Sequence, residues 1–215
     1  SLGLNQRSWT QPVNGPIQVT MIQGNIAQEN KWAEEWLIPT IHRYQDLTRE
    51  NWESDLIIWP EAALPGLYES FREPVLEPLA EEARQNNTDL ITGMLYEQNG
   101  KIYNSIMTLG SNFGTYLKRH LVPFGEYIPF RGVISWLGDM VVIPTADVSP
   151  GKEAYMLEAA GQKIAASVCY EDAYGAEMSV LLPEANLLVN VSNDAWFGDS
   201  LAPHQHLQIA RMRSI

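Results

Sequence analysis

The chain is poor in cysteine and has no long apolar run. Cys169 is the single cysteine among 215 residues, so an internal disulfide is excluded and the thiol is either core packing or a reactive group. No stretch approaches the ~18 uninterrupted apolar residues that a membrane helix requires, and the sequence as given does not open with a signal peptide. These absences predict no bilayer-spanning segment within the printed residues.

Basic residues are also scarce. The chain has 14 lysines and arginines against 26 aspartates and glutamates, a net charge of −12. This charge disfavours nucleic acid as a partner, and it disfavours the binding of anionic lipid through a polybasic segment. Glycine-rich phosphate motifs, internal repeats and low-complexity segments are missing, so we expect no nucleotide cofactor and no repeat architecture. With 45% hydrophobic residues, the chain is long enough to bury the core of one ordinary domain.

The apolar pattern predicts an α/β fold with mixed sheets and flanking helices. Helical spacing covers 34–52, and a second helix is expected over 74–86, opening at Pro74 with Pro78 in its first turn. The pair Asn99-Gly100 predicts a hairpin turn, so part of the sheet should be antiparallel. Strands are expected over 17–21, 55–59, 89–96, 102–109, 163–169 and 186–191.

Three chemically distinct side chains follow strand-like runs. Glu61 comes after Asp55–Pro60, Lys118 lies at the end of a run that starts at Gly114, and Cys169 ends the run Ile164–Val168. Because ligands of open α/β folds gather outside the carboxyl ends of strands, these groups are candidates for one site. A carboxylate can take the thiol proton while an ammonium stabilises the thiolate and an oxyanion.

The residues around these three positions resemble the Glu-Lys-Cys signature of the nitrilase (carbon-nitrogen hydrolase) superfamily. That resemblance implies an α-β-β-α sandwich. Within the superfamily, the sequence is similar to the apolipoprotein N-acyltransferases. The motifs that carry the resemblance are Trp59-Pro60-Glu61, 117–126, 120–129, Cys169-Tyr170-Glu171-Asp172 and 191–198.

The resemblance implies an acyl transfer in two steps. Cys169 would accept an acyl chain from a phospholipid as a thioester and pass it to the α-amino group of the N-terminal diacylglyceryl-cysteine of an apolipoprotein. Glu61 would be the base, Lys118 the oxyanion stabiliser, and Glu126 an acid that orients Lys118. No cofactor or metal is expected. Tyr170 and Glu171 would support the site.

Two tryptophans are expected to meet the lipid substrates. Trp32 matches an aromatic position near the acyl entrance in the resembled family. Trp136 lies in the apolar stretch 130–144, which with 62–68 is expected either to lean on the bilayer and line the acyl pocket or to pack as core loops.

The resemblance also implies a location and a domain division. Residues 1–16 would be a linker from a membrane span that is absent here, and 17–215 the catalytic domain, truncated at its C-terminal end. Helical character is expected over 204–215. The protein would act at the cell inner membrane, with the catalytic domain on the periplasmic side.

Several alternatives stay open at this point. The same triad fits a soluble nitrilase-like amidase that passes the acyl group to water, and the fold alone fits a non-catalytic lipoprotein-binding module. His120 offers a papain-like partner for Cys169, although the Glu-Lys pairing suits the pattern better. His204 and His206 are spaced i, i+2 and so face different sides of a helix, which disfavours a shared metal ion.

Overall fold

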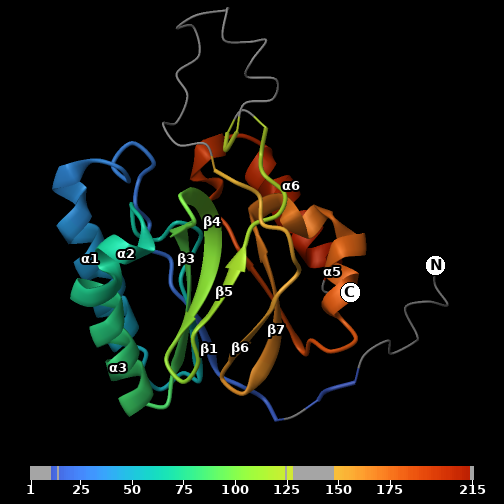
Figure 1. The fold of residues 1–215 in the computed structure, drawn as a ribbon, viewed down its shortest axis with the longest axis horizontal. Helices are drawn as coiled ribbons and strands as arrows, with labels where there is room; N and C mark the ends of the chain where they lie inside the picture. The colour runs from blue at the N-terminus through green and yellow to red at the C-terminus, as the bar shows by residue number, and fades with distance from the viewer. Residues whose placement is uncertain (1–10, 14, 124, 128–147, 214–215) are drawn as a thin grey trace, which may run out of the picture.

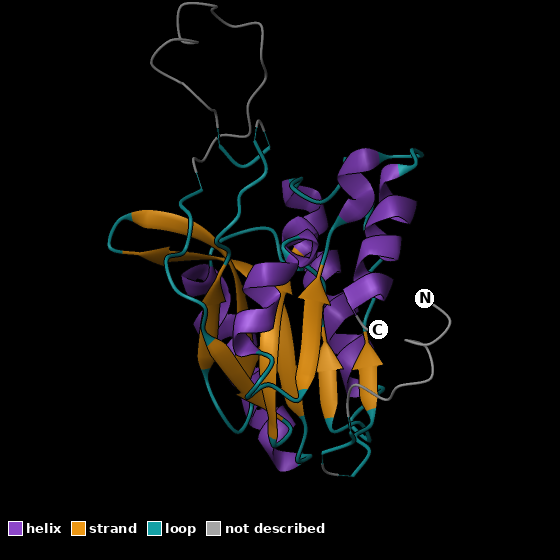
Figure 2. Cartoon of the chain, turned by 90° about the vertical axis from the view of Figure 1, so that its right-hand side faces the viewer, coloured by secondary structure: helices purple, strands orange, loops and turns teal. Residues whose placement is uncertain are grey.

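The fold is described by a computed structural model, for residues 11–13, 15–123, 125–127 and 148–213. Two sheets stack face to face and helices cover both outer faces, so the predicted α-β-β-α sandwich is confirmed (Figure 1). Helices α1 (Glu34–Arg49) and α3 (Glu77–Gln85) lie on one outside, and α5 (Gly175–Leu181) and α6 (Ala202–Arg213) on the other. Figure 2, turned by 90° from Figure 1, views the strands from the side of α5 and α6.

The first sheet has five strands in the order β1-β2-β3-β4-β5. The first three pair in parallel, and β3 to β5 pair antiparallel. Asn99 and Gly100 connect β3 to β4 with φ values of 54° and 71°, the left-handed conformation that a two-residue hairpin turn demands. The predicted hairpin is therefore confirmed. The strands are β1 (Val19–Met21), β2 (Leu56–Ile58), β3 (Asp89–Gln98), β4 (Lys101–Leu109) and β5 (Gly114–Leu117).

The second sheet has three strands in the order β6-β7-β8: β6 (Met156–Ala159), β7 (Gln162–Val168) and β8 (Leu187–Val191). Strand β6 pairs antiparallel with β7 through a turn at Ala160-Gly161, and β7 pairs in parallel with β8. The sequence pattern did not predict β6, because its four residues are too short to show an alternation.

The second predicted helix starts earlier than expected. It begins as α2 (Tyr68–Phe71), passes through a π-helical turn (Arg72–Leu76) and continues as α3. Pro74 therefore lies inside a helical segment rather than at its start. A proline lacks the N–H that an α-helix interior needs, so the wider π turn is a physical solution at this position. Pro78 falls in the first turn of α3, as predicted.

Apolar residues form two cores, one on each side of the first sheet. The outer core joins that sheet to α1, α2 and α3, and it contains Ile57 and Leu90; the inner core lies between the two sheets, and it contains Leu56 and Ile91. This period-2 alternation along β2 and β3 is what a sheet covered on both faces requires. In the described part of the chain no helix is both long and apolar enough to cross a membrane.

The apolar loop 62–68 belongs to the outer core. Ala63, Leu64 and Tyr68 are buried there, so of the two roles considered for this loop, core packing is the one observed. The other apolar stretch, 130–144 with Trp136, lies outside the described residues. Helix α6 forms near the predicted place but starts at Ala202, and none of its described residues is fully buried.

Asp89 ties the two sheets together. This buried carboxylate stands at the start of β3, where Oδ1 accepts a hydrogen bond from the Ser111 backbone N–H (2.6 Å). Oδ2 accepts from the Ser111 hydroxyl (2.6 Å) and from the backbone N–H of Ala160 in the β6-β7 turn (2.7 Å). Gly110 makes room for it, since a Cβ there would lie 2.3 Å from Asp89 Oδ1.

Replacing Asp89 should therefore destabilise the whole fold. Asp89→Ala removes three charge-assisted hydrogen bonds, and we expect the free energy of unfolding to fall by about 2–4 kcal/mol in urea titrations. Asp55→Ala is the control, because its exposed carboxylate holds one backbone N–H, that of Gln18, and its loss should cost under ~1 kcal/mol. Equal losses for the two variants would contradict the role given to Asp89.

Candidate active site

Glu61 is placed by a tight turn at the end of β2. Trp59 anchors the turn, because its buried indole N–H donates to the Thr48 hydroxyl (2.9 Å). Strand β3 passes directly beneath, and a Cβ on Gly93 would lie 2.6 Å from the Glu61 Cα, so that approach requires glycine. Ala62 adopts a φ of 46°, an uncommon conformation that turns the chain sharply after Glu61.

Lys118 follows β5 and is almost completely buried, with 1% of its surface exposed. Its ammonium lies 2.9 Å from Glu126 Oε2 and 3.5 Å from Glu61 Oε1. Burial alone would lower the pKa of Lys118, but the negative charges of Glu61 and Glu126 outweigh it and hold that pKa above its ordinary value. Lys118 is therefore a fixed cation shared between two acids.

Two asparagines fix the Glu61 carboxylate. The Asn104 side-chain amide, from β4, donates to Glu61 Oε1 (2.7 Å) and to Glu126 Oε1 (2.8 Å). The backbone N–H of Asn193, just after β8, donates to Glu61 Oε2 (2.9 Å). Both carboxylate oxygens are thus held by groups that come from different sheets, which leaves little rotational freedom.

Cys169 stands where β7 ends and a short 3-10 helix (Cys169–Ala173) begins. Its φ of 53° is unusual for a residue with a side chain, and strain of this kind gathers at functional sites. The Asn190 side chain donates to the Cys169 carbonyl (2.7 Å) and secures the turn. Burial and the nearby Glu61 raise the pKa of the thiol to about 11, against an opposing influence of Lys118, so the resting group is a thiol.

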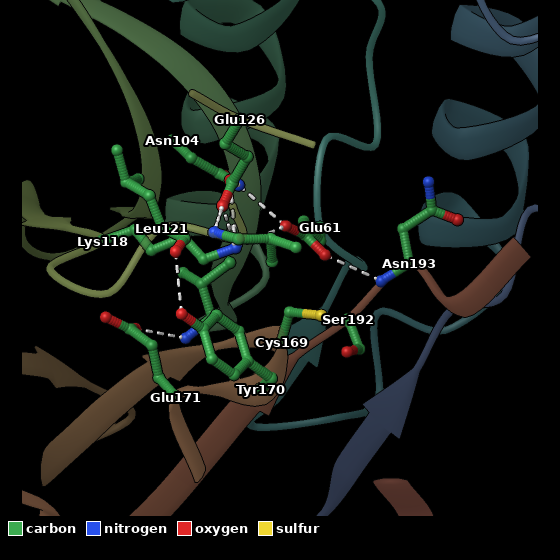
Figure 3. Close-up of polar contacts among 12 residues, drawn as sticks. Glu61, Asn104, Lys118, Leu121, Glu126, Cys169, Tyr170, Glu171, Ser192 and Asn193 are labelled. Carbon is green, nitrogen blue, oxygen red and sulfur yellow. Dashed lines mark hydrogen bonds and ion pairs between the residues drawn. The ribbon is translucent and has the colours of Figure 1, made fainter. Parts of the chain in front are cut away.

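The structure thus brings Glu61, Lys118 and Cys169 together, as Figure 3 shows. Glu126, expected to orient Lys118, contacts its ammonium. Such a cluster can move a proton from a thiol to a carboxylate beside a fixed positive charge.

The two residues after Cys169 support this arrangement. The Tyr170 hydroxyl donates to the Leu121 carbonyl (2.8 Å), and its ring lies 5.8 Å from the Lys118 ammonium. Glu171 is buried and its carboxylate accepts from the Val168 N–H (2.8 Å) and the Tyr116 hydroxyl (3.0 Å). The Glu171 carboxylate also accepts hydrogen bonds from the backbone N–H groups of Arg119 and His120, the two residues that follow Lys118. Glu171 therefore fastens the Cys169 turn to the Lys118 segment.

The remaining expected residues lie further out. Trp32 is 48% exposed, on the loop between β1 and α1, and Trp136 lies outside the described residues. His120 stacks on Tyr174 with ring centres 4.0 Å apart and bonds to Glu177. The imidazole that a papain-like pair would need is thus engaged elsewhere, in agreement with the preference for the Glu-Lys pairing.

Sequence reasoning missed Lys31, a second buried lysine beside Glu61. Its ammonium donates to the Glu61 backbone carbonyl (3.3 Å) and forms no ion pair with a described residue. Burial lowers the pKa of Lys31 to about 8, although the charge of Glu61 acts in the opposite direction. The sequence carries no signal for the burial of Lys31, because a single lysine in a polar segment is typical of an exposed surface residue.

One cluster has the residue types of a metal site. Cys169, Asp194 and His206 offer ligand atoms within 4.8 Å of one another. Both ring nitrogens of His206 already face carboxylates, Nδ1 at 2.9 Å from Asp194 Oδ1 and Nε2 at 3.5 Å from Asp172 Oδ2. We therefore identify none of these residues as a metal ligand.

An α-β-β-α sandwich with a buried Cys-Glu-Lys cluster at the strand ends defines the nitrilase-type class of protein. The model of the carbon-nitrogen hydrolase family matches residues 18–215, and the chain belongs to this family. Solved structures share the fold. A CN-hydrolase superfamily protein of Xanthomonas campestris superposes with a TM-score of 0.64 at 18% sequence identity, and the match covers 93% of this chain and 71% of that one. Nit3 of Saccharomyces cerevisiae gives 0.62 at 17% identity, covering 93% and 71%.

Within this family the sequence is similar to apolipoprotein N-acyltransferases. The protein of that name from Methylococcus capsulatus is 50% identical over 210 residues, which are 96% of this chain and 42% of that protein. The one from Nitrosomonas europaea is 45% identical over 217 residues, 99% of this chain and 44% of that protein. The chain thus spans less than half the length of these curated relatives.

The pKa of the Cys169 thiol yields a direct prediction. Its alkylation by iodoacetamide should speed up about tenfold per pH unit between about pH 7 and 10, since the thiolate is the reactive form. Lys118→Met removes a charge that lowers this pKa, so the whole profile should move to higher pH. The rates are measured by mass spectrometry, and thermal melts check that the variant is folded. A folded Lys118→Met with an unchanged profile would contradict the electrostatic contact between the two groups.

Proposed function

We propose that this chain is the catalytic domain of a phospholipid-to-apolipoprotein N-acyltransferase that works through a thioester on Cys169. The observation that carries the proposal is the convergence of a base, a fixed cation and a thiol on one buried point. The similarity to proteins named apolipoprotein N-acyltransferase, at 50% and 45% identity, supports the choice of substrates within the family.

The first half-reaction acylates the enzyme. As the Cys169 sulfur attacks the ester carbonyl of the phospholipid, its proton passes to the Glu61 carboxylate, and the ammonium of Lys118 stabilises the oxyanion. When the C–O bond breaks, Glu61 returns the proton to the leaving lysophospholipid oxygen. The products are a thioester and a lysophospholipid, with no net proton change.

The second half-reaction uses the same groups in reverse. The neutral α-amine of the diacylglyceryl-cysteine attacks the thioester, and Glu61 takes one amine proton. Glu61 then delivers that proton to the departing Cys169 sulfur, which restores the thiol. A thiol with a raised pKa suits this step, because the sulfur readily takes the proton back once the amide has formed.

Glu126, Glu171 and Tyr170 are positioning residues in this proposal. Glu126 holds the Lys118 ammonium (2.9 Å), and Glu171 fixes the nucleophile turn through the Val168 N–H (2.8 Å). The exposed indole of Trp32 would contact an acyl chain, as would Trp136.

The lipid substrates imply a membrane setting. In this proposal residues 1–16 form a linker from a membrane span and 17–215 belong to the catalytic domain. The enzyme would act on the periplasmic face of the cell inner membrane, where a phospholipid donor and an apolipoprotein acceptor meet.

The proposal predicts a covalent intermediate that can be weighed. Full-length protein in detergent is mixed with a phospholipid of one defined acyl chain, and its intact mass is recorded. We expect an increment of one acyl group, lost in Cys169→Ala and discharged by a diacylglyceryl-cysteine peptide. Glu61→Gln should slow its formation by about 10²–10⁴-fold, the usual contribution of a general base.

Other outcomes would replace the proposal. An adduct that decays equally fast without the peptide would make the protein a hydrolase that uses water as acceptor. The absence of any adduct in a folded protein that still binds the peptide would make it a lipoprotein-binding module. Glu69→Gln is the matched control, because this exposed acid pairs only with Arg72 among the described residues, and it should not change the rate.

A further inference from the structure

Two carboxylates that the proposed reaction does not use lie beside the nucleophile. Asp172 belongs to the Cys169–Ala173 turn, is 3% exposed, and neither of its carboxylate oxygens has a hydrogen-bond donor among the described residues. Asp194 opens the 3-10 helix after β8 (Asp194–Phe197), and its nearest carboxylate oxygen lies within 4.8 Å of the Cys169 sulfur. An uncompensated negative charge as close as that of Asp194 opposes the formation of a thiolate or an oxyanion.

His206 lies between these acids. It comes from α6, the helix that packs against the nucleophile turn at the right of Figure 1. Its Nδ1 lies 2.9 and 3.0 Å from the Asp194 oxygens, and its Nε2 lies 3.5 Å from Asp172 Oδ2. The same imidazole comes within 4.8 Å of the Cys169 sulfur. One ring therefore touches both acids and faces the nucleophile.

A second cation of α6 holds this helix in place. Arg213 donates to the backbone carbonyls of Asp172 (2.6 Å) and Ala173 (2.9 Å), at the end of the nucleophile turn. Gly175 leaves room for it, because a Cβ there would lie 2.3 Å from the guanidinium and would displace it. Helix α6 thus docks through charge rather than through buried apolar residues, of which its described part has none.

The ring is charged at neutral pH. The interaction with Asp172, together with the carboxylate of Asp194, raises the pKa of His206 to about 9 despite the opposing effect of burial. Because the folded-state pKa lies above the unfolded value, this contribution to stability is complete below about pH 6.5 and is lost as the pH rises through about 9.

We propose that His206 is a positioning residue whose single positive charge is shared by Asp172 and Asp194, so that these two acids oppose the negative charge developing at Cys169 less strongly, while Lys118 stabilises it. The proposal rests on Cys169 being the nucleophile. It goes beyond the Glu-Lys-Cys cluster, since it assigns a role in the electrostatics of the site to the C-terminal helix. The titratable groups that face the imidazole are Asp172 and Asp194, with the Cys169 thiol beyond them.

The test removes the cation and then the acid it balances. In His206→Gln, we expect the thiol pKa to rise by about one unit, so that alkylation of Cys169 in the full-length protein slows about tenfold near pH 8. Acyl-enzyme formation should slow by a similar factor. In the double variant His206→Gln/Asp194→Asn, most of both losses should be recovered, because an uncompensated charge within 4.8 Å of the sulfur is gone.

The control is His204→Gln. His204 is exposed on the same helix and forms no hydrogen bond or ion pair with a described residue, so this variant should match the parent. If His206→Gln lowers the melting temperature but leaves the pH profile of alkylation unchanged, the residue only docks the helix and the proposal is wrong. A double variant no better than the single one would also overturn it.

The two readouts separate this inference from the proposed function. Alkylation of Cys169 reports the charge balance whether or not the protein transfers acyl groups. If no acyl adduct forms in the parent while the alkylation profiles behave as expected, the proposed function fails and the electrostatic role of His206 stands.

Discussion

The buried ammonium of Lys118 is the group on which the site depends. Removing such an ion from water costs several kcal/mol, and only close partners offset that cost. Here the partners are Glu126 at 2.9 Å and Glu61 at 3.5 Å, with Asn104 bonded to both acids. Loss of Lys118 would leave both acids without their cation, and leaving a buried charge unpaired typically costs about 3–5 kcal/mol. The same contacts that make the lysine tolerable therefore hold the catalytic candidate Glu61 in place, so stability and site geometry are properties of one network.

The stacked sheets explain how residues so distant in the chain meet. Strands β2, β5, β7 and β8 each deliver a site residue directly after their last residue or a short turn: Glu61, Lys118, Cys169 and Asn193. Side chains at strand ends are aimed by backbone geometry rather than by loop packing. Ala62 and Cys169 adopt left-handed φ values, and this backbone strain accompanies the orientation of the neighbouring site residues.

Much of this could be predicted from the sequence, for identifiable reasons. Long strands with apolar runs and the Asn99-Gly100 turn carry strong local signals, and the three reactive residues stood out because each interrupts such a run. Strand β6 and the π turn at Pro74 were missed, since one is too short to show a period and the other depends on tertiary packing. Lys31 and His206 were not recognised as site residues. Their significance lies in burial and in distant acids, and neither property is visible in the local sequence.

The charge balance around Cys169 explains why its resting state is a thiol. Four carboxylates belong to the described part of this site, those of Glu61, Glu126, Asp172 and Asp194. The cations that contact them there are Lys118 and the His206 imidazolium, with Lys31 close to half-protonated near pH 8. A standing thiolate would face this excess of negative charge, so in the proposed reaction deprotonation becomes favourable as the sulfur bonds to a carbonyl carbon and its charge moves to an oxygen near Lys118. Such coupling requires the base and the cation to act in the same step. The raised pKa of the thiol also slows the reaction of Cys169 with oxidants and alkylating agents near neutral pH, because these reagents consume the thiolate.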